Sequence, residues 1–96
     1  MTANHALTEQ FLRHGRILRD WSPQTVRTYR FSLRDCPTDI TKGNLNAAVV
    51  AMRERGLTPG GINLRLRSIN SFLTWLHEEG HLSEALRVKL LKNPPK

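Results

Sequence analysis

The sequence has few acidic residues for its size. Eight Asp and Glu stand against fifteen Lys and Arg in 96 residues, which leaves a net charge of +7. Such an excess of positive charge favours a polyanionic partner, above all a nucleic acid. Most of the basic residues are arginine, which suits bidentate contacts with phosphate and guanine. Because small domains also carry net charge for solubility, charge alone does not decide the partner.

Disulfides and long apolar runs are also absent. Cys36 is the one cysteine and cannot form an internal disulfide, which indicates a reducing compartment. There is no charged-then-apolar leader and no run of about 18 apolar residues, so we expect neither a signal peptide nor a membrane span. These features predict a cytoplasmic protein without a membrane partner. The length fits one small domain with room for a binding face but hardly for an enclosed active site.

The long apolar patterns all have helical period, and none alternates for long enough to predict a strand. Apolar residues from Leu7 to Leu18 predict a first helix, which Gly15 weakens. Ser22 is a typical N-cap with Pro23 at the first helical position, and Pro37 closes this second helix.

Two further helices are marked by similar signals. Thr41 is expected to cap a third helix, with Gly56 in the left-handed position after its last turn. Thr58 with a following proline opens a long fourth helix that ends at Gly80, and a short fifth helix is predicted from Ser83 to about residue 91. The sequence therefore predicts an all-α bundle of four to five helices.

Two motifs within these helices carry a family resemblance. Residues 22–33 fit S-x-x-T-x-x-x-Y-x-x-x-L, and residues 57–82 fit L-T-x-x-x-I-x-x-x-L-x-x-I-x-x-F-L-x-W-L-x-x-x-G-x-L. In this order and spacing they resemble the N-terminal, SAM-like core-binding domain of tyrosine recombinases, the phage integrase family. The resemblance spans about residues 7–92. It implies a DNA-binding domain over residues 1–92 and the start of a linker to an absent catalytic domain over residues 93–96.

The resemblance also implies a function and partners. The domain would recognise and position a core-type site for DNA integration or excision, and the full-length parent would be a tyrosine recombinase. The expected partners are double-stranded DNA, the catalytic domain of the same polypeptide and other recombinase protomers on DNA. No catalytic residue, metal or cofactor is expected in this chain, and Tyr29 matches a core position of the family. Because the sequence starts with Met1, we expect no arm-binding domain before it.

The charge pattern predicts which faces meet DNA. There is no acidic residue from Trp21 to Arg34 or from Arg55 to His77, as a surface facing phosphates requires. The helical wheel turns these residues away from the apolar stripes: Gln24, Arg27, Thr28, Phe31 and Arg34 on the second helix, and Asn63, Arg67, Asn70, Ser71 and Thr74 on the fourth.

The family comparison selects a partly different set. It implies DNA contacts at positions Ser22, Thr25, Arg27, Thr28, Arg34, Gly60, Arg67, Ser68 and Ser71. On the fourth helix the two sets differ by about a third of a turn and share Arg67 and Ser71. Alternatively, all these residues form ordinary solvated faces.

Parts of the sequence also match three other functions. Residues 77–81 satisfy the zinc-hydrolase motif H-E-x-x-H, but Gly80 should end the helix before His81 and separate the two histidines. Met52, Gly56 and Ile62 match the spacing of a helix-turn-helix regulator, although Arg65 stands where the next apolar residue is expected. A helical protein-interaction module without a nucleic-acid role is the third alternative.

Overall fold

Over residues 3–92 the chain folds into four α-helices and one short 3-10 turn. The computed structural model describes residues 3–92, and the predicted linker at 93–96 lies outside the described residues. The elements are α1 (Ala3–Leu18), α2 (Pro23–Ser32), η1 (Leu33–Asp35), α3 (Lys42–Glu54) and α4 (Pro59–Glu78). Over residues 3–92 there is no strand, so the predicted all-α class is confirmed.

The helices begin where local signals predict. Ser22, Thr41 and Thr58 each accept a hydrogen bond from the backbone N–H three residues later, at 3.2, 3.0 and 3.1 Å. Pro23 and Pro59 occupy the first helical positions, where no N–H is needed. The N-cap predictions and the prolines predicted at first helical positions are confirmed. The second helix ends earlier than predicted from Pro37: α2 ends at Ser32, and η1 continues the chain to Asp35.

Two glycines end the third and fourth helices. Gly56 and Gly80 have φ angles of 85° and 82°, a region that only glycine enters at little cost. After Gly56 the N–H of Leu57 donates to the carbonyl of Met52 at 3.2 Å, which is the bond of a Schellman motif. The predicted ends of these two helices are therefore also confirmed.

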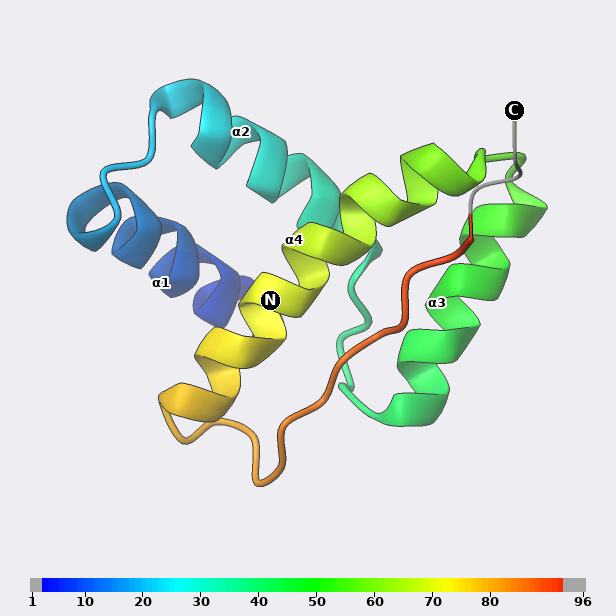
Figure 1. Cartoon of the computed structure of the whole chain (residues 1–96). Coiled ribbons are helices and arrows are strands. Elements are labelled where there is room, and N and C mark those ends of the chain that lie inside the picture. The colour runs from blue at the N-terminus through cyan, green and yellow to red at the C-terminus, as the bar shows by residue number, and fades with distance from the viewer. Residues whose placement is uncertain (1–2, 93–96) are drawn as a thin grey trace.

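Helix α4 lies at the centre of the molecule. It packs against α1, α2 and α3, and Figure 1 shows it running between the α1–α2 pair and α3. Its side chains supply much of the core, including Ile62, Leu66, Ile69, Phe72, Leu73 and Leu76, none more than 1% exposed. The exposed residues of α4 are thus held in place by the buried residues of the same helix.

The turn between α1 and α2 is held by aromatic packing. Trp21 stacks on Tyr29, with 4.2 Å between ring centroids and 16° between ring planes, and both rings meet Phe11 edge-on. The indole lies so close to Gly15 that a Cβ there would fall 2.0 Å from a ring atom. Gly15 lowers the helix propensity of α1, but because it has no side chain it makes room for the Trp21 ring. Tyr29 is a packing residue, as its match to a core position of the family implies.

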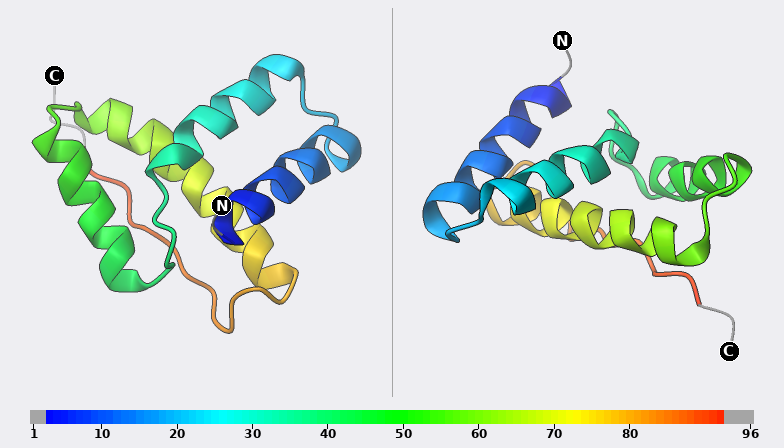
Figure 2. Two further views of the ribbon diagram at one scale, coloured as in Figure 1. Left: turned by 180° about the vertical axis from the view of Figure 1, so that it is seen from behind. Right: turned by 90° about the horizontal axis from the view of Figure 1, so that it is seen from above.

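The predicted fifth helix is wrong. No helix is present over residues 81–92; the chain instead follows an open path beside α4, as two views in Figure 2 show. We call residues 82–92 the strap. The side-chain amide of Asn70 both donates to the carbonyl of Val88 and accepts from its N–H, at 2.9 and 2.8 Å. Asn63 makes the same pair with Leu91, both at 2.8 Å.

These four bonds explain why the strap is not helical. They satisfy backbone groups that would otherwise pair within a helix. Leu86, Val88 and Leu90 also alternate with exposed Arg87 and Lys89, which is the pattern of an extended chain. The side chain at Val88 is buried and the leucines on either side pack on the core. The strap therefore covers one side of α4.

Candidate nucleic-acid interface

The outer face of α2 is exposed as predicted. Gln24, Arg27 and Arg34 are exposed, and Thr28 is half-buried with its hydroxyl donating to the carbonyl of Gln24 at 3.0 Å. Ser22 and Thr25 lie at the start of the helix, where their hydroxyl oxygens are 3.0 Å apart and Ser22 caps the chain. These two residues therefore have a structural role at the helix end, which faces solvent.

The fourth helix does not present the face that the wheel predicts. Asn63 and Asn70 are only 5% and 8% exposed, because the strap lies over them and uses both of their amides. Ser68, implied by the family comparison, is also buried, at 5% exposed. The expectation that Asn63 and Asn70 point outward is wrong, and Ser68 is not accessible either.

The exposed stripe of α4 lies between these two alternatives. It follows helical spacing over Gly60, Leu64, Arg67, Ser71 and Thr74, of which Ser71 is half-buried and the others are exposed. Arg67 and Ser71, the two residues shared by both sequence arguments, are on it. At Gly60 a Cβ would meet no atom within 4 Å, so a nucleic-acid strand could approach the first turn of α4 closely.

Arg65 is not available to a ligand, although the acid-free sequence around it suggests that it is. Its Nε donates to Asp35 Oδ2 at 3.0 Å, and its side chain is 13% exposed. Arg55 pairs with the other oxygen of the same carboxylate at 2.6 Å. The Asp35 carboxylate is thus held by two guanidinium groups, and its side chain is only 15% exposed.

Phe31 is an exposed aromatic on α2, with 49% of its surface accessible. The guanidinium carbons of Arg65 and Arg34 lie 5.0 and 6.0 Å from its ring centroid. Contacts of this kind orient arginine side chains at modest energetic gain. Phe31 therefore helps to hold Arg34 in position on the outer face.

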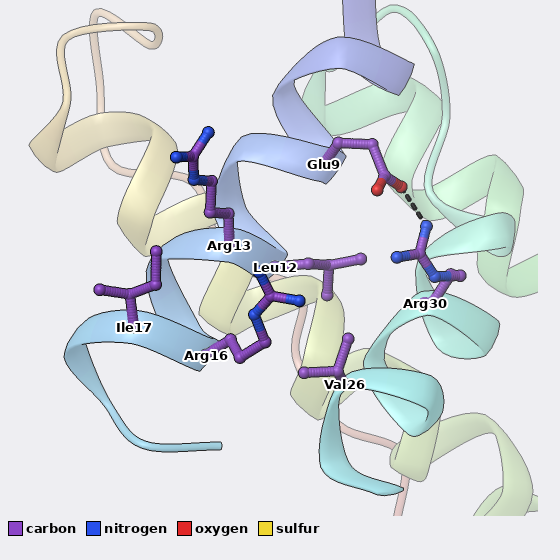
Figure 3. A pocket seen from close by; sticks show the side chains of 7 residues that line it. All are labelled: Glu9, Leu12, Arg13, Arg16, Ile17, Val26 and Arg30. Carbon is purple, nitrogen blue, oxygen red and sulfur yellow. Dashed lines mark hydrogen bonds and ion pairs between the residues drawn. The ribbon is translucent and has the colours of Figure 1, made fainter. Parts of the chain in front are cut away.

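A hollow of about 340 Å³ lies between α1 and α2. Figure 3 shows that the Glu9 carboxylate on α1 faces the Arg30 guanidinium on α2, and the two form an ion pair across it. Arg13 and Arg16 also line the hollow, together with the side chains of Leu12 and Val26. Because one carboxylate belongs to the hollow, it is less suited to phosphate than the acid-free faces of α2 and α4.

The outer faces of α2 and α4 retain uncompensated positive charge. Within residues 3–92, Arg27, Arg34 and Arg67 form no ion pair, whereas Arg30, Arg55 and Arg65 do. The two faces belong to helices that pack against each other. We group their outward residues as a candidate surface, the α2–α4 face. It is defined by ten residues, none of them acidic: Gln24, Arg27, Thr28, Phe31, Arg34, Gly60, Leu64, Arg67, Ser71 and Thr74.

The zinc motif does not form a metal site. Helix α4 ends at Glu78, and His81 follows the left-handed Gly80, so His77 and His81 are not on one continuous helix. His77 Nδ1 lies instead 3.2 Å from the carbonyl of Leu82. Among the described residues, no group of three or more His, Cys, Asp or Glu side chains could hold a metal ion. Across the same part of the chain, no helix combines the length and apolar character needed to cross a membrane.

The fold and this surface define a small all-helical domain with a basic, acid-free face. The chain is similar to the tyrosine recombinase XerC of Shewanella amazonensis, with 29% identity over 80 residues, covering 75% of this chain and 27% of that protein. It thus spans about a quarter of the length of this relative. No family model matches the chain, and no solved structure matches it. The similarity supports a recombinase-related domain.

Proposed function

We propose that this chain is the core-binding domain of a tyrosine recombinase and grips double-stranded DNA with its α2–α4 face. The observation that carries the proposal is the exposure of Arg27, Arg34 and Arg67, unpaired among the described residues, on a surface without carboxylates. Each arginine can replace counterions on the DNA backbone, which is the main source of affinity for such a surface. The similarity to a tyrosine recombinase supports the same reading.

Short polar groups beside the arginines suit contacts in the major groove. Gln24, Thr28 and Ser71 project from helices, and such groups hydrogen-bond to base edges while arginine reaches guanine or phosphate. The domain would position a core-type site for integration or excision. The chemistry would belong to a catalytic domain of the same polypeptide, and other recombinase protomers would bind the same DNA. We also propose a cytoplasmic location, as the sequence predicts.

The direct test is the salt dependence of binding to a random-sequence duplex. If about five phosphates are contacted, the logarithm of the binding constant should fall with the logarithm of salt concentration with a slope of about −4 to −5. We expect micromolar or weaker affinity at physiological salt, as for non-specific binding in general. Absence of binding at low salt, or binding that salt does not weaken, would contradict the proposal and favour a protein-interaction module.

A double variant separates this proposal from a helix-turn-helix regulator. In that alternative α4 would be the recognition helix and α3 its companion, so α2 would contribute little. In the proposed domain both α2 and α4 contact DNA. The double variant Arg27→Ala with Arg34→Ala should therefore weaken DNA binding about as much as alanine substitutions on the exposed stripe of α4. Full affinity in this double variant, together with loss of affinity in Arg67→Ala, would favour the regulator.

A further inference from the structure

A second polar groove lies where the strap passes α4. It has a volume of about 280 Å³. Its lining residues come from both elements: Arg67, Asn70, Ser71 and Thr74 from α4, and Arg87 and Leu90 from the strap. Because the exposed stripe of α4 includes three of these residues, the groove borders the α2–α4 face and opens on the same side of α4.

The groove has the chemistry of a phosphate site. Arg67 and Arg87 supply two guanidinium groups from segments twenty positions apart, and Ser71 and Thr74 supply hydroxyl donors. No acidic residue lines it, in contrast to the hollow between α1 and α2, where Glu9 pairs with Arg30 (Figure 3). Guanidinium groups with neighbouring hydroxyls are typical partners of phosphate oxygens.

The backbone on both sides of the groove is held in place. Arg67 is on the central helix, and Arg87 directly precedes Val88, whose N–H and carbonyl are both bonded to Asn70. Asn70 itself forms part of the groove wall, and its amide is already used in these bonds. Since the two arginines start from fixed positions, only their side chains must be ordered when an anion binds, which limits the entropic cost.

We propose that this groove binds one phosphate of the DNA backbone between Arg67 and Arg87, so that the strap is part of the DNA-binding surface. The inference rests on the proposed function and extends it to a segment that neither the helical wheel nor the family motifs select. It also gives the strap a role beyond covering α4. The segment that leads out of the domain would be anchored on the DNA itself.

The test compares Arg87→Ala with Lys89→Ala on the same duplex. Both residues are exposed on the strap and carry one positive charge, but Lys89 does not line the groove. Losing one phosphate contact removes about 0.9 of a released counterion, so at 0.1 M salt Arg87→Ala should bind about eightfold more weakly, with a salt slope less steep by about 0.9. Lys89→Ala should keep the wild-type slope.

The double variant Arg67→Ala with Arg87→Ala provides a second readout. If both arginines hold the same phosphate, the double variant should lose less affinity than the product of the two single losses. Equal effects of Arg87→Ala and Lys89→Ala while the wild type binds DNA would overturn the groove but leave the proposed function standing. Failure of the wild type to bind would overturn both.

A free phosphate or phosphorylated small molecule offers the same chemistry as the DNA backbone. Inorganic phosphate is therefore titrated against the DNA-free domain at constant ionic strength, with the arginine Nε–H resonances followed by NMR. We expect no saturation below about 10 mM, because one isolated phosphate lacks the rest of the DNA contact surface. Saturation at micromolar phosphate would overturn the assignment to DNA in favour of a small phosphorylated ligand.

Discussion

The side-chain amide of Asn70 pairs with both backbone hydrogen-bonding groups of Val88, as a neighbouring β-strand would. The amide is buried and the two bonds are 2.9 and 2.8 Å long. Asn63, two helical turns earlier, repeats the arrangement at Leu91. A helix surface has no free backbone groups with which to bind an extended chain, so these two amides take their place.

This relationship predicts a large effect for a small change at Asn70. Asn70→Ala leaves the buried N–H and carbonyl of Val88 without partners, which should lower the free energy of unfolding by about 2 to 4 kcal/mol. Urea denaturation measures the loss. Asn46→Ala, at an exposed position of α3, is the matched control and should change stability by no more than about 0.5 kcal/mol. Equal stability of the two variants would show that the strap is not held by the Asn70 amide.

The close approach of Trp21 to Gly15 gives a second prediction. Gly15→Ala should raise the intrinsic helix propensity of α1, yet its Cβ would fall 2.0 Å from an indole atom. Displacing the indole disturbs its stack on Tyr29, so we expect a loss of about 1 to 3 kcal/mol despite the better helix former. Gly43→Ala in α3 is the control, because its Cβ would meet only one atom, 4.0 Å away. We expect it to be neutral or stabilising by up to about 1 kcal/mol. A Gly15→Ala variant that is more stable than wild type would contradict the packing described here.

The helices could be predicted from the sequence because their signals are local. Ser22, Thr41 and Thr58 act within three residues of their own positions, and Gly56 and Gly80 act within the last helical turn. Such signals do not depend on the tertiary fold. They therefore locate each helix end without knowledge of the neighbouring segments.

The strap and its contacts could not be predicted in the same way. A helical wheel places Asn63 and Asn70 on the solvent-facing side of α4 because they are polar. It uses only the residues of one helix, so it does not include a segment eighteen or more residues later that binds them. One signal was available: Leu86, Val88 and Leu90 alternate with basic residues. Three alternations are too few to be distinguished from a short helix by period alone.

Arg65 shows the same limitation for charge. It stands in an acid-free stretch, but its partner Asp35 is thirty residues earlier, at the end of η1. Counting charges along a helix therefore overstates the number of arginines available to DNA. Of the two arginines on α4, Arg67 is exposed and Arg65 is used to join α4 to η1. The exposed residues of α4 were thus predicted only in part, and the contact of α2 and α4 with DNA stays a prediction.

The thiol of Cys36 should react slowly in the folded domain. Burial raises the pKa of its thiol from 9.0 to about 12, so at pH 8 almost none of it is thiolate, the reactive form. We expect native protein to react with a disulfide reagent at pH 8 far more slowly than protein unfolded in urea. Rapid labelling of the native domain would show that Cys36 is accessible.

The same shift has a consequence for stability at high pH. The folded state holds the proton of the Cys36 thiol more tightly than the unfolded state does, so the protonated thiol stabilises the fold. This stabilisation is complete below about pH 9 and is lost as the pH rises towards about 12. Wild type should therefore lose more stability than Cys36→Ala between pH 8.5 and 11, since the variant lacks this titration. Parallel losses in the two proteins would mean that Cys36 does not contribute.

Arg67 lies on the exposed stripe of α4 and lines the groove with Arg87. Arg67→Ala should weaken DNA binding by about 1 to 2 kcal/mol at 0.1 M salt, because it removes a phosphate contact from an acid-free surface. If the contact is to phosphate, two duplexes of unrelated sequence should be weakened equally, whereas loss of a base contact would affect one more than the other. Fluorescence anisotropy with both duplexes distinguishes the two cases.

Arg53 is the control for this change, because it is exposed on α3, beside Glu54, and is not one of the residues that define the α2–α4 face. Arg53→Ala removes the same charge and should change binding by no more than about 0.5 kcal/mol. The comparison therefore separates a located contact from the effect of net charge, which both variants lower by one. Equal weakening by both variants would mean that α4 has no special position against DNA. The binding would then be a property of overall charge, and the protein-interaction alternative would explain the exposed face better.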